Sequence, residues 1–126
     1  MNQILARQFA SEWIQAWNQH DLAKICAFYA EGCELSSPFI PEVIKRPITE
    51  IKGLSNIRRY WEKAFAEMPN ISFELVSVMA GVDSIVITFY GVYNALSGNV
   101  FYFDKDNKII KSSAFIDLVL NPPRSK

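Results

Sequence analysis

The 126-residue sequence lacks the features of several large classes of protein. It has no excess of charge, because 13 lysines and arginines balance 13 aspartates and glutamates. Nucleic-acid binding draws on an excess of positive charge, so no nucleic-acid partner is expected. No stretch is apolar over the length needed to cross a bilayer or to act as a signal peptide. We therefore expect a cytoplasmic protein with no membrane partner.

Residues that bind metals or form disulfides are also scarce. The chain has two cysteines, Cys26 and Cys33, which are too few for a disulfide framework, and we expect them to be reduced and buried. Its one histidine, His20, cannot supply a histidine cluster and is expected to be a solvated turn residue. The sequence accordingly predicts no metal site and no cofactor.

What the chain has instead is apolar and aromatic content. Half of its residues are hydrophobic and 13% are aromatic, against 21% charged, which is typical of a globular protein. The length allows one hydrophobic core. We expect a single domain over residues 1–120 and a short tail at 121–126.

Helical periodicity marks the first half of the chain. Leu5, Phe9, Trp13 and Trp17 recur every fourth residue and predict one face of a helix. Asp21 can cap a second helix, with Phe28 and Tyr29 in its buried stripe and Gly32 at its end. A short strand is expected at residues 33–37. Ser55 can cap a third helix, whose stripe contains Ile57, Trp61, Ala64, Phe65 and Met68.

Residues 38–52 combine three prolines with many apolar side chains. The prolines predict neither a regular helix nor a central strand, and the apolar residues predict contact with another surface. The sequence leaves open whether this segment is a lid or an interface loop.

After residue 70 the hydrophobic period changes to two. Residues 71–80, 85–93, 99–104 and 109–120 predict four strands joined by short turns, which favour antiparallel neighbours. Helices followed by a run of strands indicate an α+β fold, with helices on one face of the sheet.

Several motifs in this order resemble the nuclear-transport-factor-2-like superfamily, in its SnoaL-like and ketosteroid-isomerase-like branch. They are residues 17–22 (WNQHDL), 28–32 (FYAEG) with Ser37-Pro38, 53–61 (GLSNIRRYW), and 101–104 (FYFD) with 108–110 (KII). The resemblance implies a cone-shaped α+β barrel, with three helices on a curved, mostly antiparallel sheet that encloses a pocket. It also implies a homodimer in many members.

The catalytic groups that this resemblance implies are replaced in the sequence. Ketosteroid isomerases use a tyrosine, a basic aspartate and a protonated aspartate where this chain has Trp13, Ser37 and Asn99. Limonene-epoxide-hydrolase-like sites need an Arg-x-Asp and a late acid where it has residues 90–92 (YGV) and Ala114. Serine cannot act unaided as a general base near neutral pH.

The expected ligand-binding residues combine these positions with strand parity. They are Trp13, Trp17, Leu35, Ser37, Tyr90, Asn99, Ser112 and Ala114. Parity places Ile110 on the same face as Ser112 and Ala114. The lining that this predicts is aromatic or small and polar, without a buried carboxylate.

Three functions remain open from the sequence. The first is binding of a small apolar molecule with a few polar groups. The second is an isomerase, dehydratase or cyclase, in which Tyr90 or Asn99 polarises a carbonyl and Glu42 or Glu50 acts as the base. The third is a protein-interaction module.

Strands 71–80 and 85–93 carry apolar residues on both parities. One face can pack on the helices, and the other would leave an apolar surface in water. We expect a homodimer formed through the outer face of the sheet.

Overall fold

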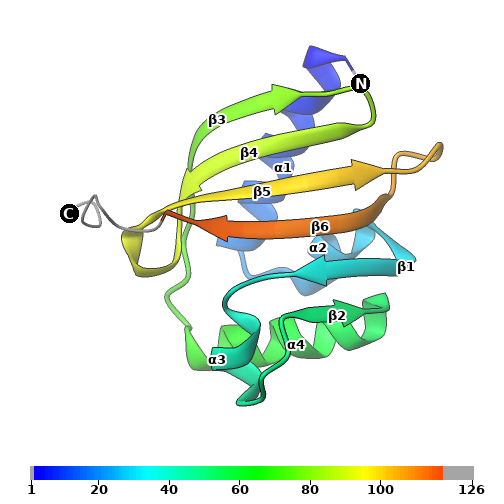
Figure 1. Cartoon of the computed structure of the whole chain (residues 1–126). Coiled ribbons are helices and arrows are strands. Elements are labelled where there is room, and N and C mark those ends of the chain that lie inside the picture. The colour runs from blue at the N-terminus through cyan, green and yellow to red at the C-terminus, as the bar shows by residue number, and fades with distance from the viewer. Residues whose placement is uncertain (1, 118–126) are drawn as a thin grey trace.

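The computed structural model describes residues 2–117, and in it helices cover one face of a single sheet (Figure 1). The α+β class predicted from the sequence is confirmed. The expected tail at 121–126 and the end of the last expected strand lie outside the described residues. In chain order the elements are α1 (Gln3–Asn18), α2 (Leu22–Ala27), β1 (Tyr29–Ser36), α3 (Ile40–Ile44), β2 (Glu50–Lys52), α4 (Leu54–Glu67), β3 (Glu74–Ala80), β4 (Ser84–Tyr90), a 3₁₀ turn (Val92–Asn94), β5 (Leu96–Phe103) and β6 (Ile109–Ile116).

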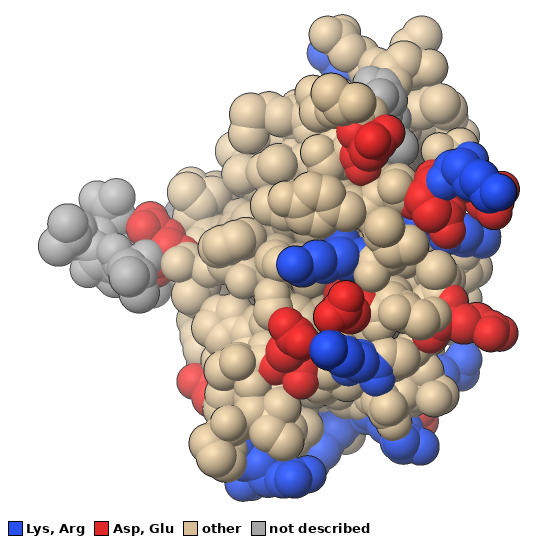
Figure 2. Space-filling model, turned by 45° about the vertical axis from the view of Figure 1, so that its right-hand side comes forward, with Lys and Arg blue, Asp and Glu red and all other residues tan. Residues whose placement is uncertain are grey.

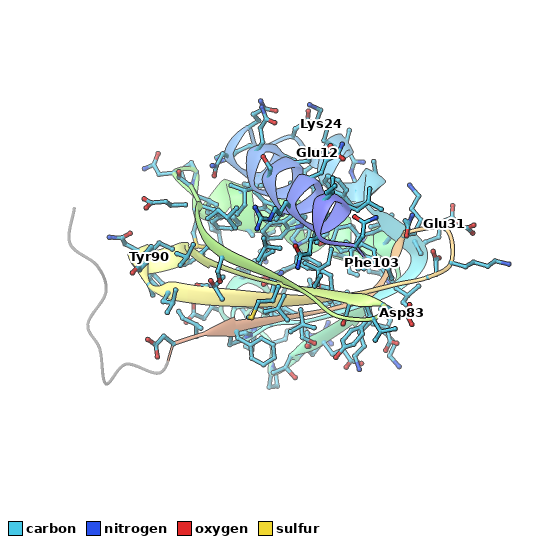
Figure 3. All side chains as sticks on the ribbon, turned by 90° about the horizontal axis from the view of Figure 1, so that it is seen from above. Glu12, Lys24, Glu31, Asp83, Tyr90 and Phe103 are labelled. Atoms are coloured by element: carbon cyan, nitrogen blue, oxygen red, sulfur yellow. The ribbon has the colours of Figure 1, made fainter. Side chains whose placement is uncertain are left out.

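The sheet of the described residues has six strands in the order β2-β1-β6-β5-β4-β3. Its neighbours are antiparallel except for β1 and β6, which run parallel. The view from above shows the helices stacked over one face of the curved sheet (Figure 3). Strands β2 and β3 are the edges of this curved, mostly antiparallel sheet, which is not closed on itself.

The first helix packs on the sheet through a stripe that differs from the predicted one. Ala6, Ala10, Trp13 and Trp17 are buried, whereas Leu5 is 47% exposed. The small alanines let the helix backbone approach the sheet, and the tryptophans fill the space further along the helix. Asn2 caps this helix, since its Oδ1 accepts a hydrogen bond from the backbone N–H of Leu5 at 2.8 Å.

The second helix is shorter than the sequence predicts. It ends at Ala27, and β1 begins at Tyr29, so Gly32 lies within a strand and does not terminate the helix. Tyr29 is buried and pairs with Ile109 of β6. This pairing with a strand far away in the sequence decides the boundary, and local periodicity cannot reveal it.

The proline-rich stretch 38–52 differs from the irregular segment that its sequence predicts. It contains the short helix α3, which places Pro41 in the first turn, where a missing N–H costs no hydrogen bond. Ile40 and Val43 of this helix are buried, and α3 contacts α4. The stretch then forms β2, which extends the sheet as an antiparallel neighbour of β1.

The four strands predicted after residue 70 are present as β3 to β6, with shifted ends. β3 begins at Glu74, later than predicted. Tyr102 of β5 pairs with Lys111 of β6, and the next residue, Phe103, pairs with Ile109. Ile110 therefore has no partner on β5 and forms a β-bulge. Ile110 is therefore exposed, whereas strand parity predicts that it shares the face of Ser112.

The turn between α1 and α2 holds the segment that leads into β3. The Asn18 amide forms two hydrogen bonds with the backbone of Phe73: Nδ2 donates to the carbonyl oxygen at 2.9 Å, and Oδ1 accepts from the N–H at 2.6 Å. His20 Nε2 donates to the carbonyl oxygen of Ile71 at 2.9 Å, and its ring packs against Phe65. His20 is thus a tethering residue and not the solvated turn residue that the sequence predicts.

Both cysteines behave as the sequence predicts. Cys26 and Cys33 are buried and free, and burial raises the pKa of each thiol. No helix in the described part of the chain is long and apolar enough to span a membrane.

The sheet face opposite the helices, which we call the outer face, is largely apolar. Exposed or half-buried side chains on it include Val86, Leu96, Val100, Tyr102 and Phe115. Glu34 and Lys111 lie opposite each other toward the β1 side of this face. Acidic and basic side chains are interspersed on the view in Figure 2, without a large patch of one sign.

The Asn18 tether can be tested by mutation. Asn18→Ala leaves the N–H and carbonyl oxygen of Phe73 without their partners, and we expect the free energy of unfolding to fall by about 1–3 kcal/mol. Urea unfolding monitored by tryptophan fluorescence measures this change. Gln19→Ala alters the exposed neighbouring side chain and serves as the control. Equal stability of the two variants would contradict the tether.

Candidate functional site

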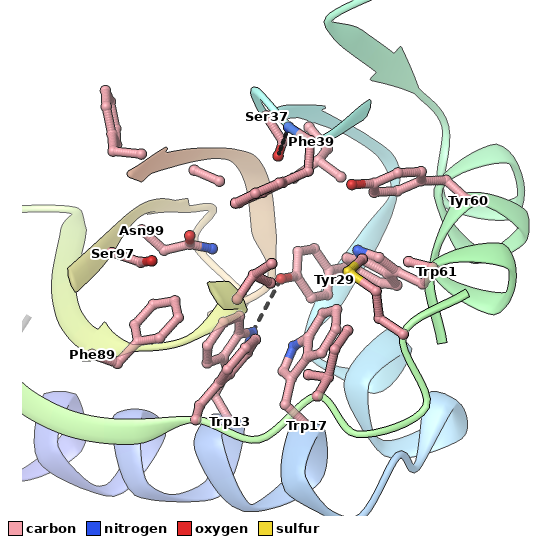
Figure 4. Close-up of a pocket in the computed structure, with 18 residues that line it drawn as sticks. Trp13, Trp17, Tyr29, Ser37, Phe39, Tyr60, Trp61, Phe89, Ser97 and Asn99 are labelled. Carbon is pink, nitrogen blue, oxygen red and sulfur yellow. Dashed lines mark hydrogen bonds between the residues drawn. The ribbon is translucent and has the colours of Figure 1, made fainter. Parts of the chain in front are cut away.

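A cavity of about 80 Å³ lies between the helices and the inner face of the sheet (Figure 4). Its walls come from α1, β1, α4, β4, β5 and β6, from the segment before α3, from the segment after α4 and from the 3₁₀ turn. The lining includes the exposed Phe115 and the half-buried Phe39 and Val92, so the cavity reaches the surface. It is small for a ligand pocket, which favours a small molecule or one that projects from the mouth.

Aromatic rings form the wall beside α1. Trp13 stacks on Phe73, with ring centroids 5.7 Å apart and planes at 19°. Trp17 lies 5.3 Å from Phe73 and meets Trp61 edge-on at 5.6 Å. Tyr29 also meets Trp61 edge-on, at 5.1 Å. These contacts hold the rings in place and present flat apolar surfaces to the cavity.

A buried hydrogen bond joins two of these rings. Trp13 Nε1 donates to Tyr29 Oη at 3.2 Å (Figure 4). Burial raises the pKa of Tyr29 above its ordinary value, and the Trp13 hydrogen bond lowers it by less, so the phenol keeps its proton. The nearby Ser112 hydroxyl also lowers this pKa, although its oxygen is buried without a hydrogen-bond partner among the described residues.

A second polar group lies where β1 leads into α3. Ser37 Oγ accepts a hydrogen bond from the backbone N–H of Phe39 at 3.1 Å, and Tyr60 faces the same part of the cavity (Figure 4). Burial raises the pKa of Tyr60 to about 12, with an opposing effect from the Ser37 hydroxyl and a smaller increase from the Glu42 carboxylate. Both tyrosines are therefore hydrogen-bond donors at neutral pH.

The lining contains no aspartate, glutamate, histidine, lysine or arginine among the described residues. The same part of the chain contains no group of histidine, cysteine and acidic side chains that could hold a metal ion. The cavity as described is electrically neutral, and its polar atoms are hydroxyl, indole and amide groups.

The fold and this cavity can now be compared with known proteins. The model of the SnoaL-like domain matches residues 10–109. The chain belongs to the SnoaL-like family. A SnoaL-like protein of unknown function from Burkholderia thailandensis is 38% identical, with 93% of this chain and 98% of the other covered and a TM-score of 0.86.

Two further structures share the fold of this SnoaL-like domain at low identity. An NTF2-like protein of unknown function from Cytophaga hutchinsonii is 11% identical, with 89% of each chain covered and a TM-score of 0.67. The second is SalBIII, an epoxide hydrolase/cyclase-like enzyme with a role in pyran ring formation in the polyether salinomycin. It is 15% identical, with 93% of this chain and 94% of that chain covered and a TM-score of 0.70. No curated protein matches the chain.

Most of the binding residues expected from the sequence lie together in the SnoaL-like cavity. Those in the lining are Trp13, Trp17, Leu35, Ser37, Asn99 and Ala114. Tyr90 is outside the lining, because the alternation along β4 directs Phe89 to the inner face. Ser112 is also outside it and is fully buried between its strand neighbours Leu35 and Phe101.

The two acidic residues considered as bases are in different surroundings. Glu42 is exposed on α3, and its Oε2 accepts a hydrogen bond from Tyr93 Oη at 3.2 Å. The ring of Tyr93 packs against Phe39, which lines the cavity, so Glu42 lies near this side of the cavity. Glu50 is exposed on the edge strand β2, where it is the strand partner of Ser36. Its Oε1 lies 4.0 Å from Lys52 Nζ.

Sequence reasoning did not assign Tyr29 and Tyr60 to the site. The sequence predicts that Tyr29 belongs to the second helix and that the strand starts at residue 33. In the structure Tyr29 begins β1, and its pairing with Ile109 places it in the cavity lining. Tyr60 directly precedes Trp61 in α4, and the pair was a usable signal. Two large aromatic residues in succession on an amphipathic helix cannot both occupy the centre of its buried stripe, so one of them lies at the stripe's edge.

The raised pKa of Tyr60 predicts a loss of stability at alkaline pH. The unfolded chain releases the phenol proton near pH 10, whereas the folded chain retains it to about pH 12. We expect the free energy of unfolding to fall by up to about 1.4 kcal/mol per pH unit between these values from this group. Urea unfolding at pH 9–11 should show a weaker decline for Tyr60→Phe. Parallel pH curves for the variant and the wild type would contradict this prediction.

Proposed function

We propose that this SnoaL-like domain binds a small, neutral and mainly apolar molecule in the cavity of Figure 4. The observation that carries the proposal is a lining of aromatic, aliphatic and small polar side chains without a charged group among the described residues. A charged ligand would lose its hydration there without gaining a partner of opposite charge. A flat apolar body would replace water against the tryptophan and phenylalanine rings.

The same lining bears on catalysis. The positions at which the resemblance implies an acid or a base hold Ser37 and Asn99, and both are uncharged. Proton transfer at neutral pH needs a group that exchanges its proton in that range, which neither side chain does unaided. We therefore favour binding over acid–base chemistry within the cavity.

An isomerase, dehydratase or cyclase remains the alternative, and one observation supports it. Glu42 accepts a hydrogen bond from Tyr93, whose ring packs against the cavity-lining Phe39, so this carboxylate lies on the Phe39 side of the cavity. In such an enzyme Asn99 would polarise a carbonyl and Glu42 would take up the proton. Binding of the ligand is required in either case.

Filling the cavity tests the proposal. Ala114 lies opposite Asn99 on the neighbouring strand and lines the cavity, so Ala114→Leu adds bulk where the ligand is expected. We expect the affinity for ethylbenzene, measured by calorimetry, to fall by about tenfold or more. Ala66→Leu adds the same bulk to an exposed position of α4 and should leave the affinity unchanged. Absence of binding to the wild type would reject the function.

We also propose that two copies of the chain associate through the outer face of the sheet. The support is the apolar surface around Val100, which monomers rarely leave in water. A two-fold contact brings this surface against itself, and the adjacent Glu34 and Lys111 supply complementary charges that such a symmetric contact can pair.

Molecular mass in solution tests this association. Light scattering at micromolar concentration should give twice the chain mass of 14.4 kDa. Val100→Glu places a charge within the apolar face and should return the mass to that of one chain. A wild-type mass of 14.4 kDa would contradict the dimer.

A further inference from the structure

Two segments that are far apart in the sequence meet where the cavity reaches the surface. Phe39, which precedes α3, and Val92, which begins the 3₁₀ turn between β4 and β5, both line the cavity and are half-buried. Figure 1 shows this turn and α3 at the same end of the sheet. Tyr93, the next residue of the turn, reaches across. Its hydroxyl donates to Glu42 Oε2 at 3.2 Å, and its ring centroid lies 6.2 Å from that of Phe39. We call these two contacts the Tyr93 bridge.

The α3 side of the bridge is anchored in the core. Ile40 and Val43 of α3 are 0% and 2% exposed, and the helix contacts α4. The backbone just before the helix is held as well, because the N–H of Phe39 donates to Ser37 Oγ at 3.1 Å. A movement that widened the mouth on this side would bring buried apolar side chains into water. We therefore treat α3 as the fixed side of the mouth.

The turn on the other side can shift at a lower cost. Its own backbone closes it: the Asn94 N–H donates to the carbonyl oxygen of Gly91 at 2.8 Å, and the Ala95 N–H donates to that of Val92 at 3.2 Å. These bonds are local and survive when residues 91–95 move together. The side chain of Tyr93 is 64% exposed, so its displacement uncovers little buried surface. The turn is thus the movable side of the mouth.

The backbone of the turn is also strained. Tyr93 and Asn94 have φ values of 60° and 54°, in the left-handed region that side chains other than glycine disfavour. Such a conformation persists where surrounding contacts hold it. The hydrogen bond of Tyr93 to Glu42 and its ring contact with Phe39 are contacts of this kind. Breaking them favours movement of the turn.

The size of the cavity indicates why such movement is needed. Its volume is about 80 Å³, whereas a cavity of about 150 Å³ is known to hold benzene. Trp13, Trp17 and Phe73 contact one another along the wall beside α1, so this wall cannot move outward without disrupting the core. A ligand with an aromatic ring therefore requires the mouth to widen, and the turn is the side that can move.

We propose that Tyr93 is a gate residue, whose bridge to Glu42 and Phe39 holds the 91–95 turn at the cavity mouth until a ligand enters or leaves. This inference rests on the proposed small-molecule binding and adds how ligand exchange is controlled. Tyr93 is outside the cavity lining, so it contributes to the rates of exchange and little to the affinity. Entry and exit use the same opening, and a weaker bridge accelerates both by the same factor.

The exchange kinetics of nitrobenzene test the gate. All three tryptophans of the chain, Trp13, Trp17 and Trp61, line the cavity. Nitrobenzene is neutral and quenches indole fluorescence, so stopped-flow fluorescence follows its binding and release. Tyr93→Phe removes the hydroxyl and keeps the ring. We expect the association and dissociation rate constants both to rise about threefold or more, which is the effect of one hydrogen bond, and the Kd to stay within about twofold.

Two further sets of variants identify the contact responsible. Tyr102→Phe makes the same chemical change at a 44% exposed position near the far end of β5, and it should leave both rate constants unchanged. Glu42→Ala removes the acceptor of the bridge and should also accelerate exchange. If the two groups act as one contact, Tyr93→Phe has little further effect in the Glu42→Ala background. Tyr93 and Glu42 are both exposed, so these variants keep the core intact.

The outcomes separate the gate from the function on which it rests. If nitrobenzene does not bind to the wild type, the proposed small-molecule binding is rejected and the gate with it. If it binds and Tyr93→Phe leaves both rate constants unchanged, binding stands and the gate is overturned. A change in the dissociation rate constant alone, with a matching change in Kd, also overturns it, because that result makes Tyr93 part of the binding surface. Additive effects of Tyr93→Phe and Glu42→Ala would overturn the bridge between them.

Discussion

The packing of Trp13 and Trp17 of α1 against the inner face of the sheet is the contact on which the rest of the structure depends. These rings touch Phe73, Phe89 and Phe101 from three different parts of the chain. Bulky rings in mutual edge and stacked contact cannot fill all the space between a straight helix and a curved sheet. The cavity is the space that remains, and its position follows from the same contacts that hold helix and sheet together.

The cavity combines apolar walls with polar atoms that cannot reach water. Tyr29 is satisfied by Trp13, whereas Trp17 Nε1 has no partner among the described residues. A core built only for stability would pair or omit such a group, because a buried and unpaired donor is costly. Polar atoms that stability does not require, placed beside a neutral cavity, are what a binding site for a neutral ligand needs.

The two faces of the sheet differ in burial. Inward-facing Ile85 and Ile87 are fully buried beneath the helices, whereas outward-facing Val86 and Thr88 are half-buried. The edge strand β2 extends the sheet, whereas the helix α3 packs against α4 and carries Glu42. A segment that sequence patterns leave irregular thus completes one side of the site.

The sequence by itself determined the α+β class and the order of the long helices and strands, because hydrophobic periodicity is a local property. The family resemblance, which is carried by motifs, added that Trp13, Trp17, Ser37 and Asn99 lie around one cavity. Only the tertiary structure decided which groups face the cavity. A bulge turned Ile110 outward, strand pairing with Ile109 drew Tyr29 under the cavity, and the alternation of β4 kept Tyr90 out of its lining. These outcomes depend on register between strands that are distant in the chain, which no local pattern records.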